Sequence, residues 1–195
     1  LNSKILIDQL NEYKVSNDKK ILKKIINLTI ESRIAIMQID ALASNLGHTF
    51  GHAIEKFSDY KVLHGDAISA GTIIALNYSV HIGIMANEVK DDIIDNMKFL
   101  GLNLYIDENL DSKKIIELML LDKKSSSTTL NLVLIKGVSS PYSENGRFFC
   151  KSDPDKVETF LSNFLKTYEY KIENCSQYLE RDVIGQVVDK FIVEL

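Results

Sequence analysis

The chain has 195 residues, a formal net charge of −4, and a composition of 45% hydrophobic and 26% charged residues. This composition is typical of a soluble globular domain with its own apolar core, and it excludes disordered, collagen-like and low-complexity chains. The mild acidity, with no basic tract, does not favour nucleic acid as a partner, and no apolar run reaches the ~18 residues that a membrane-spanning helix needs.

Helices are the main element that the sequence predicts. Two prolines and nine glycines are few, which favours long helices over many short strands. Asn17 or Asp18 is expected to cap the first helix, Gly101 to end the fourth and Asp111 to cap the fifth. The helical spacing of apolar residues predicts helices over residues 21–37, 45–57, 64–85, 91–100 and 112–121.

One predicted helix carries small residues on a single face. Ala67, Gly71 and Ala75 recur at every fourth position between residues 64 and 85. Residues four apart lie above one another on a helix, so these positions form a stripe without large side chains. We expect another backbone to approach the helix closely along this stripe.

The last third of the chain predicts a small β-hairpin between helices. Residues 130–135 alternate in the manner of a strand, and residues 147–150 are the candidate partner strand. Asp153 followed by Pro154 predicts the start of a helix that runs to about residue 168. A last amphipathic helix is predicted over residues 176–193. The predicted fold is therefore mainly α with a small β-hairpin, divided into a helical domain over residues 1–168 and a C-terminal helical extension over residues 169–195.

Three of the four histidines lie close together in the sequence, at positions 48, 52 and 64. His48 and His52 are one helical turn apart, and His64 begins the next predicted helix, so its ring could turn back toward the same face. Neutral imidazoles suit Zn²⁺, and an open coordination position would make the site catalytic. A histidine pair at this spacing is by itself a weak metal signal, and the alternative is one capping and one surface histidine. Glycines that would admit a backbone or a ligand flank the cluster at Gly47, Gly51 and Gly65.

Two segments around these histidines carry a family resemblance. Residues 45–55 (NLGHTFGHAIE) and 63–75 (LHGDAISAGTIIA) resemble the metal-binding signature of 3-dehydroquinate synthase and related sugar phosphate cyclases. Residues 118–124 (LMLLDKK), followed by 132–135 (LVLI), resemble a later motif of the same family. The resemblance covers about residues 1–167 and implies the family's helical, metal-binding C-terminal domain.

The resemblance also implies a role for individual residues. His48 and His64 match the two histidines that bind zinc, and His52 matches the histidine that assists proton transfer. Asn45 matches an asparagine that binds substrate, and Arg33 stands at the position of a substrate-binding lysine. Arginine there keeps the charge but has no amine that titrates. Lys123 or Lys124 matches a catalytic lysine that binds the anionic groups of the substrate.

The family's reaction is implied in the same way. A secondary alcohol of a seven-carbon sugar acid phosphate is oxidised by bound NAD, phosphate is eliminated, the ketone is reduced again and an aldol step closes the carbocycle. Zn²⁺, or another divalent metal, polarises the alcohol and then the carbonyl. Such a lyase serves the shikimate pathway of aromatic amino acid biosynthesis. The two cysteines lack metal-type spacing and favour a reducing compartment, so we expect a cytoplasmic protein. The resemblance also implies a homodimer.

The chain departs from the family pattern in several respects. The family's third zinc ligand, a glutamate, and its NAD-binding domain both lie upstream of the matched region, and neither has a counterpart here. Ala41 stands where the family has an arginine, and the loop between Asp40 and Asn45 is shorter. The chain begins with Leu1, so we expect it to be processed or part of a longer protein. It should not be a complete catalyst alone, and an NAD-binding domain is expected in cis or in trans.

Other functions stay open alongside this one. The chain could belong to another sugar phosphate cyclase, such as 2-deoxy-scyllo-inosose synthase. It could also be a non-catalytic remnant or partner subunit, or a metal domain of the polyol dehydrogenase type. Retention of the three histidines argues against a remnant, and loss of the arginine argues for one.

Several polar residues have simpler expected roles. His81 is expected to be structural, and Asp66 to interact favourably with a helix dipole. Glu55 is expected to pair on the surface, with the alternative that it holds a histidine. The lysines at 19, 20, 23 and 24 are expected to form a solvated helix face.

Overall fold

Helices form most of the chain, as predicted. The computed structural model describes residues 3–107, 109–121 and 129–168. A short 3-10 helix, η1, spans Ala41–Ser44 between the second and third helices. The α-helices are α1 (Ser3–Ser16), α2 (Lys19–Ile39), α3 (His48–Phe57), α4 (His64–His81), α5 (Asn87–Phe99), α6 (Ser112–Leu120) and α7 (Pro154–Thr167).

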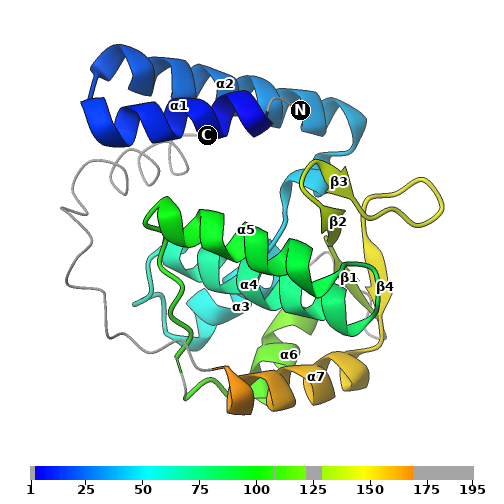
Figure 1. Ribbon diagram of the computed structural model, residues 1–195. Coiled ribbons are helices and arrows are strands. Elements are labelled where there is room, and N and C mark those ends of the chain that lie inside the picture. Colours follow the sequence, from blue (N-terminus) through cyan, green and yellow to red (C-terminus); the bar gives the residue numbers. More distant parts are fainter. Residues whose placement is uncertain (1–2, 108, 122–128, 169–195) are drawn as a thin grey trace.

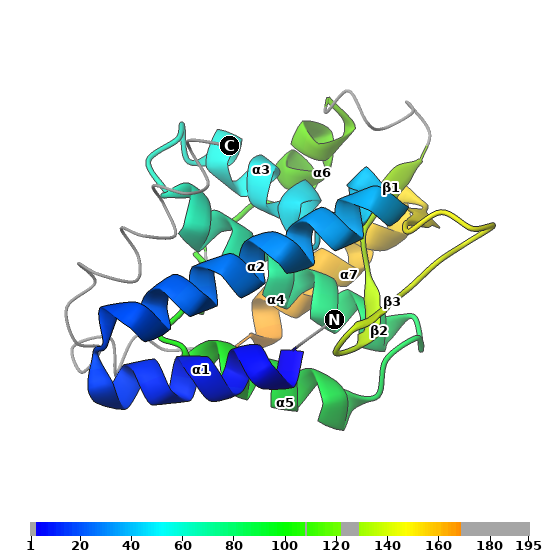
Figure 2. The same ribbon diagram turned by 90° about the horizontal axis from the view of Figure 1, so that it is seen from above.

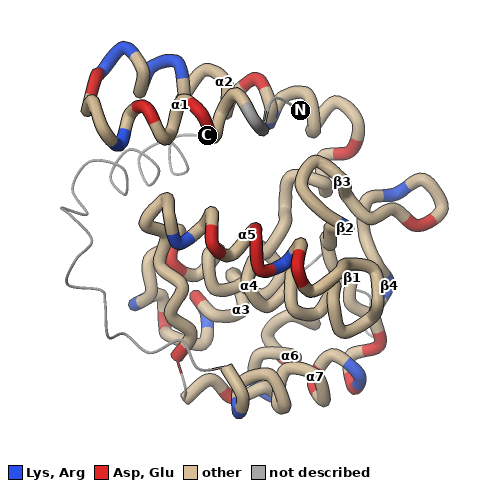
Figure 3. Tube along the Cα trace, viewed as in Figure 1, with Lys and Arg blue, Asp and Glu red and all other residues tan. Residues whose placement is uncertain are grey.

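The first two helices form an antiparallel hairpin along one side of the molecule (Figures 1 and 2). Helix α1 was not among the predicted elements. Asp18 caps α2, because its carboxylate accepts a hydrogen bond from the Lys20 N–H at 2.8 Å. Helix α1 packs chiefly on α2, and it also touches α5, where the Lys14 ammonium lies 3.8 Å from the centre of the Phe99 ring. The predicted lysine face is exposed on α2 and appears among the blue positions of Figure 3.

Helices α3 and α4 cross with almost no side chain between their backbones. A Cβ placed on Gly71 would overlap the Gly47 carbonyl oxygen and lie 2.6 Å from the Gly51 nitrogen. A Cβ on Gly51 would lie 3.0 Å from the Ala67 carbonyl oxygen. The close approach predicted from the small residues of α4 is therefore confirmed, and its partner is α3.

Glycine also sets where these helices begin and end. Gly47 has a φ of +76°, in the left-handed region, so the chain turns there and α3 begins at His48 rather than at Asn45 as predicted. Gly83 has a φ of +77°, and α4 ends at His81, before the predicted end at residue 85. Gly101 has a φ of +76° just after α5, which confirms its predicted role in ending that helix.

Helix α4 is the centre of the apolar core. Its residues Ile73, Ile74 and Leu76 are fully buried. Helix α3 contributes Phe50 to the core around them, and α6 contributes Met119. Helices α3, α5 and α7 contact α4, and α6 packs against α3 and α7 (Figure 2), which accounts for the nearly continuous run of buried residues in α4.

The strands form two small sheets instead of the single predicted hairpin. Strand β1 (Leu130–Leu132) pairs antiparallel with β4 (Cys150–Ser152), and β2 (Ile135–Gly137) pairs with β3 (Ser140–Pro141). The predicted strand over residues 130–135 was wrong in its continuity. Residues 132–134 are all buried, which one flat strand with alternating faces cannot achieve, so the chain bends between β1 and β2.

Two further features complete the described part of the chain. Asp153 caps α7 by accepting from the Asp155 N–H at 2.9 Å, with Pro154 in the first turn, as predicted. The helix predicted over residues 176–193, and with it the extension over residues 169–195, lies outside the described residues. Among the described helices, none combines the length and the apolar character needed to cross a membrane.

Candidate metal and substrate site

The three histidines of the signature come together at the crossing of α3 and α4. His48 begins α3, His52 lies one turn further along it, and His64 begins α4. The ring centroids are 5.5 Å apart for His48 and His52, and 5.8 Å apart for each of the other two pairs. The glycine-lined crossing makes this possible, because it holds the two helix starts side by side.

His48 is held by a main-chain carbonyl group. Its Nδ1 lies 3.1 Å from the Leu46 carbonyl oxygen, which can only accept, so Nδ1 carries the hydrogen and Nε2 presents its lone pair. Burial lowers the pKa of His48, against the hydrogen bond to Leu46, which raises it, and the charges of His52, His64 and Arg33 add to the lowering. His48 is therefore a neutral imidazole at neutral pH, the form that binds a metal. Every residue has a main-chain carbonyl, so the residue type of Leu46 could not predict this hydrogen bond. The one signal in the sequence is Gly47, which follows Leu46 and allows the chain to turn there.

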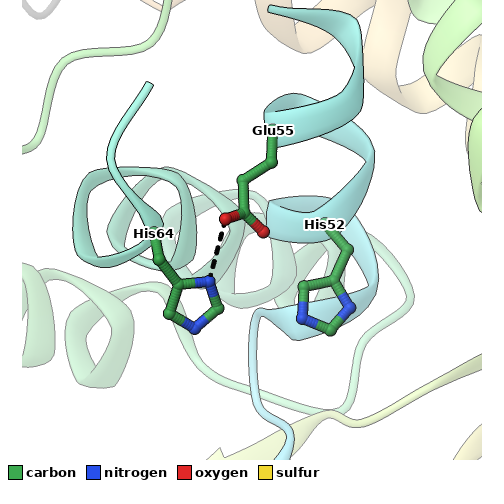
Figure 4. A group of neighbouring side chains, drawn as sticks. All are labelled: His52, Glu55 and His64. Atoms are coloured by element: carbon green, nitrogen blue, oxygen red, sulfur yellow. Dashed lines mark hydrogen bonds and ion pairs between the residues drawn. The ribbon is translucent and has the colours of Figure 1, made fainter. Parts of the chain in front are cut away.

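His64 is held by a carboxylate instead (Figure 4). Its Nδ1 lies 3.0 Å from Oε1 of Glu55, and the side chains are 26% and 15% exposed respectively. A carboxylate only accepts, so the hydrogen again lies on Nδ1 and the lone pair on Nε2. Of the two expectations for Glu55, the structure supports the one in which it holds a histidine, and surface pairing was wrong.

The donor set fits a divalent metal ion. Two imidazoles bound to one tetrahedral Zn²⁺ through bonds of about 2.1 Å have ring centres about 5 Å apart, close to the spacing observed here. A second grouping shares His64, since possible ligand atoms of His52, Glu55 and His64 all lie within 4.8 Å of one another. Imidazole nitrogens with a nearby carboxylate are donors that suit Zn²⁺ and similar ions.

The remaining predicted site residues differ in how close they lie to the histidines. The Asn45 carbonyl oxygen accepts a hydrogen bond from the His48 N–H at 3.1 Å, so Asn45 lies next to the first residue of α3. Arg33 is exposed on α2, near enough for its charge to affect the pKa of His48. Lys123 and Lys124 lie outside the described residues.

Two residues with simpler predicted roles also have clear positions. His81 lies at the far end of α4, with its ring centroid 5.0 Å from that of Phe160 and 6.1 Å from that of Tyr78. His81 itself is exposed, and these ring contacts place it at the end of α4 away from the other three histidines. Asp66 lies in the first turn of α4, where a negative charge favours the helix dipole.

Known sequences place this chain in a family. The family model described as 3-dehydroquinate synthase C-terminal matches residues 3–125. A 3-dehydroquinate synthase of Francisella tularensis subsp. tularensis is 37% identical over 97 residues, which cover 49% of this chain and 27% of that protein. The 3-dehydroquinate synthase of Campylobacter jejuni subsp. jejuni is 32% identical over 160 residues, covering 78% of this chain and 43% of that protein. The chain thus spans less than half the length of these relatives.

Solved structures agree with the fold. A 2-deoxy-scyllo-inosose synthase complexed with carbaglucose-6-phosphate, NAD⁺ and Co²⁺ matches with a TM-score of 0.64 and 22% identity, over 75% of this chain and 42% of that one. A 2-epi-5-epi-valiolone synthase from Streptomyces hygroscopicus subsp. jinggangensis, with NAD⁺ and Zn²⁺ bound, matches with a TM-score of 0.55 and 14% identity, over 84% and 47%. At these identities the matches show a shared fold. With the family model covering more than half of its residues, the chain belongs to the 3-dehydroquinate synthase C-terminal family.

Proposed function

We propose that this chain is the metal- and substrate-binding domain of a 3-dehydroquinate synthase-like lyase. The proposed reaction converts a seven-carbon sugar acid phosphate into a carbocycle with elimination of phosphate, in the cytoplasmic shikimate pathway. The observation that carries the proposal is the meeting of three imidazoles at the α3–α4 crossing, two with Nδ1 already engaged.

His48 and His64 are the proposed metal ligands, each through Nε2. Both rings are oriented by an acceptor at Nδ1, so both lone pairs are preset before an ion arrives. A divalent metal such as Zn²⁺ would supply Lewis-acid polarisation of a substrate oxygen. His52 has its ring beside both others, and we assign it the exchange of a proton with the substrate.

Polar residues around the histidines are the proposed substrate contacts. Asn45 lies next to His48 at the start of α3. Arg33, on α2, has a permanent positive charge close enough to act on His48. Lys123 and Lys124 are proposed to bind the anionic groups of the substrate, on the strength of the motif alone. Cationic side chains suit a substrate that carries both a phosphate and a carboxylate.

The complete catalyst needs more than this chain. The relatives are more than twice its matched length, and solved proteins with the same fold hold NAD⁺ as well as a metal. We propose that an NAD-binding domain, in cis or in trans, completes the site, and that the working enzyme is a homodimer.

A different sugar phosphate cyclase is the second candidate. Ala41 is the first residue of η1, the short helix that ends just before Asn45. The resemblance expects an arginine at this position. Loss of a guanidinium there favours a substrate with one fewer anionic group. A 2-deoxy-scyllo-inosose synthase, whose solved structure has the same fold, is an example of such an enzyme.

Metal titration of the full chain tests the site. We expect the wild type to bind one equivalent of Co²⁺ or Zn²⁺, and His48→Ala and His64→Ala each to lose most of that affinity. His81→Ala is the matched control, because His81 packs against Tyr78 and Phe160 at the other end of α4. Unchanged metal content in both site variants would refute the metal site.

Product analysis tests the reaction. The protein is isolated from its source cells with an antibody to this chain, so that any natural NAD-binding domain is retained. It is then supplied with NAD⁺ and either a seven-carbon sugar acid phosphate or glucose 6-phosphate. Phosphate release from the sugar acid supports the first candidate, and release from glucose 6-phosphate supports the second. Net NADH production without phosphate release would contradict both and indicate a dehydrogenase.

A further inference from the structure

We infer that Glu55 is a positioning residue that holds His64 in its Nδ1–H form and thereby directs Nε2 toward the metal. This inference rests on the proposed function for the identity of the metal ligands. The hydrogen bond itself does not depend on it.

The position of Glu55 follows from its place on α3. It lies three residues after His52, so both side chains project from one face of the helix toward the start of α4. In Figure 4 the Glu55 carboxylate points at the His64 ring, and the Oε1–Nδ1 distance is 3.0 Å. At 15% exposure the carboxylate is shielded from water, which strengthens the bond beyond that of a surface pair.

The two proposed metal ligands are oriented by different kinds of acceptor. His48 donates its Nδ1–H to the neutral main-chain carbonyl of Leu46, two residues earlier. His64 donates to a charged carboxylate nine residues earlier, across the gap between two helices. The carboxylate fixes the orientation of the His64 ring and offsets part of the charge of a bound cation. Glu55 therefore acts on the metal through His64.

Direct ligation by Glu55 is the competing geometry. Glu55 belongs to a group whose possible ligand atoms lie within 4.8 Å of one another, together with His52 and His64. Ligation through Oε1 would take this oxygen from the Nδ1–H of His64 and leave that donor, at 26% side-chain exposure, without its acceptor. The observed bond instead satisfies both groups and keeps the Nε2 lone pair available.

The hydrogen position on His64 can be measured without any metal. Long-range proton–nitrogen NMR of the metal-free full chain should place the hydrogen on Nδ1 in the wild type. Glu55→Gln, whose amide oxygen still accepts, should keep this form, and Glu55→Ala should lose it. A wild-type hydrogen on Nε2, or an unchanged tautomer in Glu55→Ala, would overturn the inference. This result stands whether or not the chain is a cyclase.

Metal affinity is the second readout. We expect Glu55→Ala to weaken Co²⁺ binding by about 10- to 100-fold and Glu55→Gln to restore part of the affinity. The visible absorption of bound Co²⁺ measures the binding. The matched control is Glu88→Ala, which removes the same side chain from an exposed helix position. Rescue by glutamine separates positioning from simple loss of folding.

The outcomes separate the inference from the proposed function. If both Glu55 variants lose Co²⁺ as completely as His64→Ala, Glu55 is a direct ligand and the inference is wrong. If the wild type binds no metal while the tautomer follows Glu55 as expected, the metal site is wrong and Glu55 still positions His64.

Discussion

Gly71 is the residue on which the site's geometry depends most directly. A methyl group there would meet the Gly47 carbonyl oxygen and the Gly51 nitrogen, both of which are backbone atoms and cannot rotate away. We expect Gly71→Ala to lower the free energy of unfolding by about 1–3 kcal/mol, as overpacking does, even though alanine favours helices. Because α3 and α4 must separate, metal affinity should fall as well.

Gly137 provides the matched control for this substitution. A Cβ there would lie 3.5 Å from the Val89 Cγ1, an ordinary contact. Gly137→Ala should therefore change the free energy of unfolding by no more than about 0.5 kcal/mol and leave metal affinity intact. Urea denaturation of both variants measures the difference. Equal stability of Gly71→Ala and the wild type would show that the helices can move apart freely.

The pH dependence of stability should carry a contribution from His48. Burial lowers the pKa of His48 from its ordinary value of 6.5, so the unfolded chain takes up the proton first as the pH falls. The contribution is present above 6.5 and is lost as the pH falls through the folded-state pKa. In the metal-free chain, unfolding free energies between neutral pH and pH ~5 should fall less steeply in His48→Gln than in the wild type. An identical slope in the two proteins would contradict this expectation.

At the residue scale, the sequence predicted the groups that carry chemistry but not what holds them. Three histidines close together are visible as residue types, and their spacing indicated a shared face. The Leu46 carbonyl carries no residue-specific signal, and the Glu55–His64 bond depends on the angle between two helices. Such contacts follow from tertiary packing, which spacing along one helix does not determine.

At the scale of elements, Asp40 joins α2 to η1 in the sequence and links both to a residue 108 positions later. It ends α2, caps η1 by accepting from the Leu42 N–H at 2.9 Å, and accepts from the Phe148 N–H at 3.2 Å. The bond from Leu42 is the main cause that lowers the pKa of Asp40, and the Arg147 guanidinium, 3.7 Å away, adds to it. Asp40 thus connects the segment between α2 and η1, which precedes His48, to the loop between β3 and β4.

Replacement of Asp40 should have a local and a distant effect. Asp40→Ala should reduce stability by about 1–2 kcal/mol through the lost cap, and it should also speed hydrogen exchange at the Phe148 amide. Asp18→Ala removes a comparable cap at the start of α2, with no contact to that loop. Both variants should lose stability, and only Asp40→Ala should speed hydrogen exchange at the Phe148 amide. Unchanged exchange there would mean that the loop is held by other contacts.

Element boundaries were predictable where a cap has a chemical signature. Asp18, Asp111 and Asp153 each accept a backbone N–H at the start of a helix, as their residue type indicated. Helix α1 was missed because Tyr13 is the one buried apolar side chain among residues 5–16, the part of α1 whose burial is described, so the apolar periodicity is weak. The strand boundaries failed for the opposite reason, since consecutive buried residues hide the bend between β1 and β2.

For the whole molecule, the arrangement of helices predicts two levels of stability. Helices α3, α4, α6 and α7 share the apolar core, whereas α1 rests chiefly on α2 and touches α5 through Lys14 and Phe99. Segments with few buried apolar contacts open locally, at a lower free energy than global unfolding. The α1–α2 hairpin should therefore exchange its amide hydrogens well before α4 does.

Metal binding should act on these two levels differently, because both proposed ligands stand at the starts of core helices. An ion at about 100 times its dissociation constant stabilises the folded state by about 2.7 kcal/mol, so exchange that requires global unfolding should slow by about 100-fold. Hydrogen exchange with mass spectrometry should show this slowing in α3 and α4 after Zn²⁺ is added, and little change in α1. His64→Ala should abolish the effect. Equal slowing in α1 would mean that the hairpin unfolds together with the core, and no slowing in wild-type α4 would mean that the ion does not bind at the α3–α4 crossing.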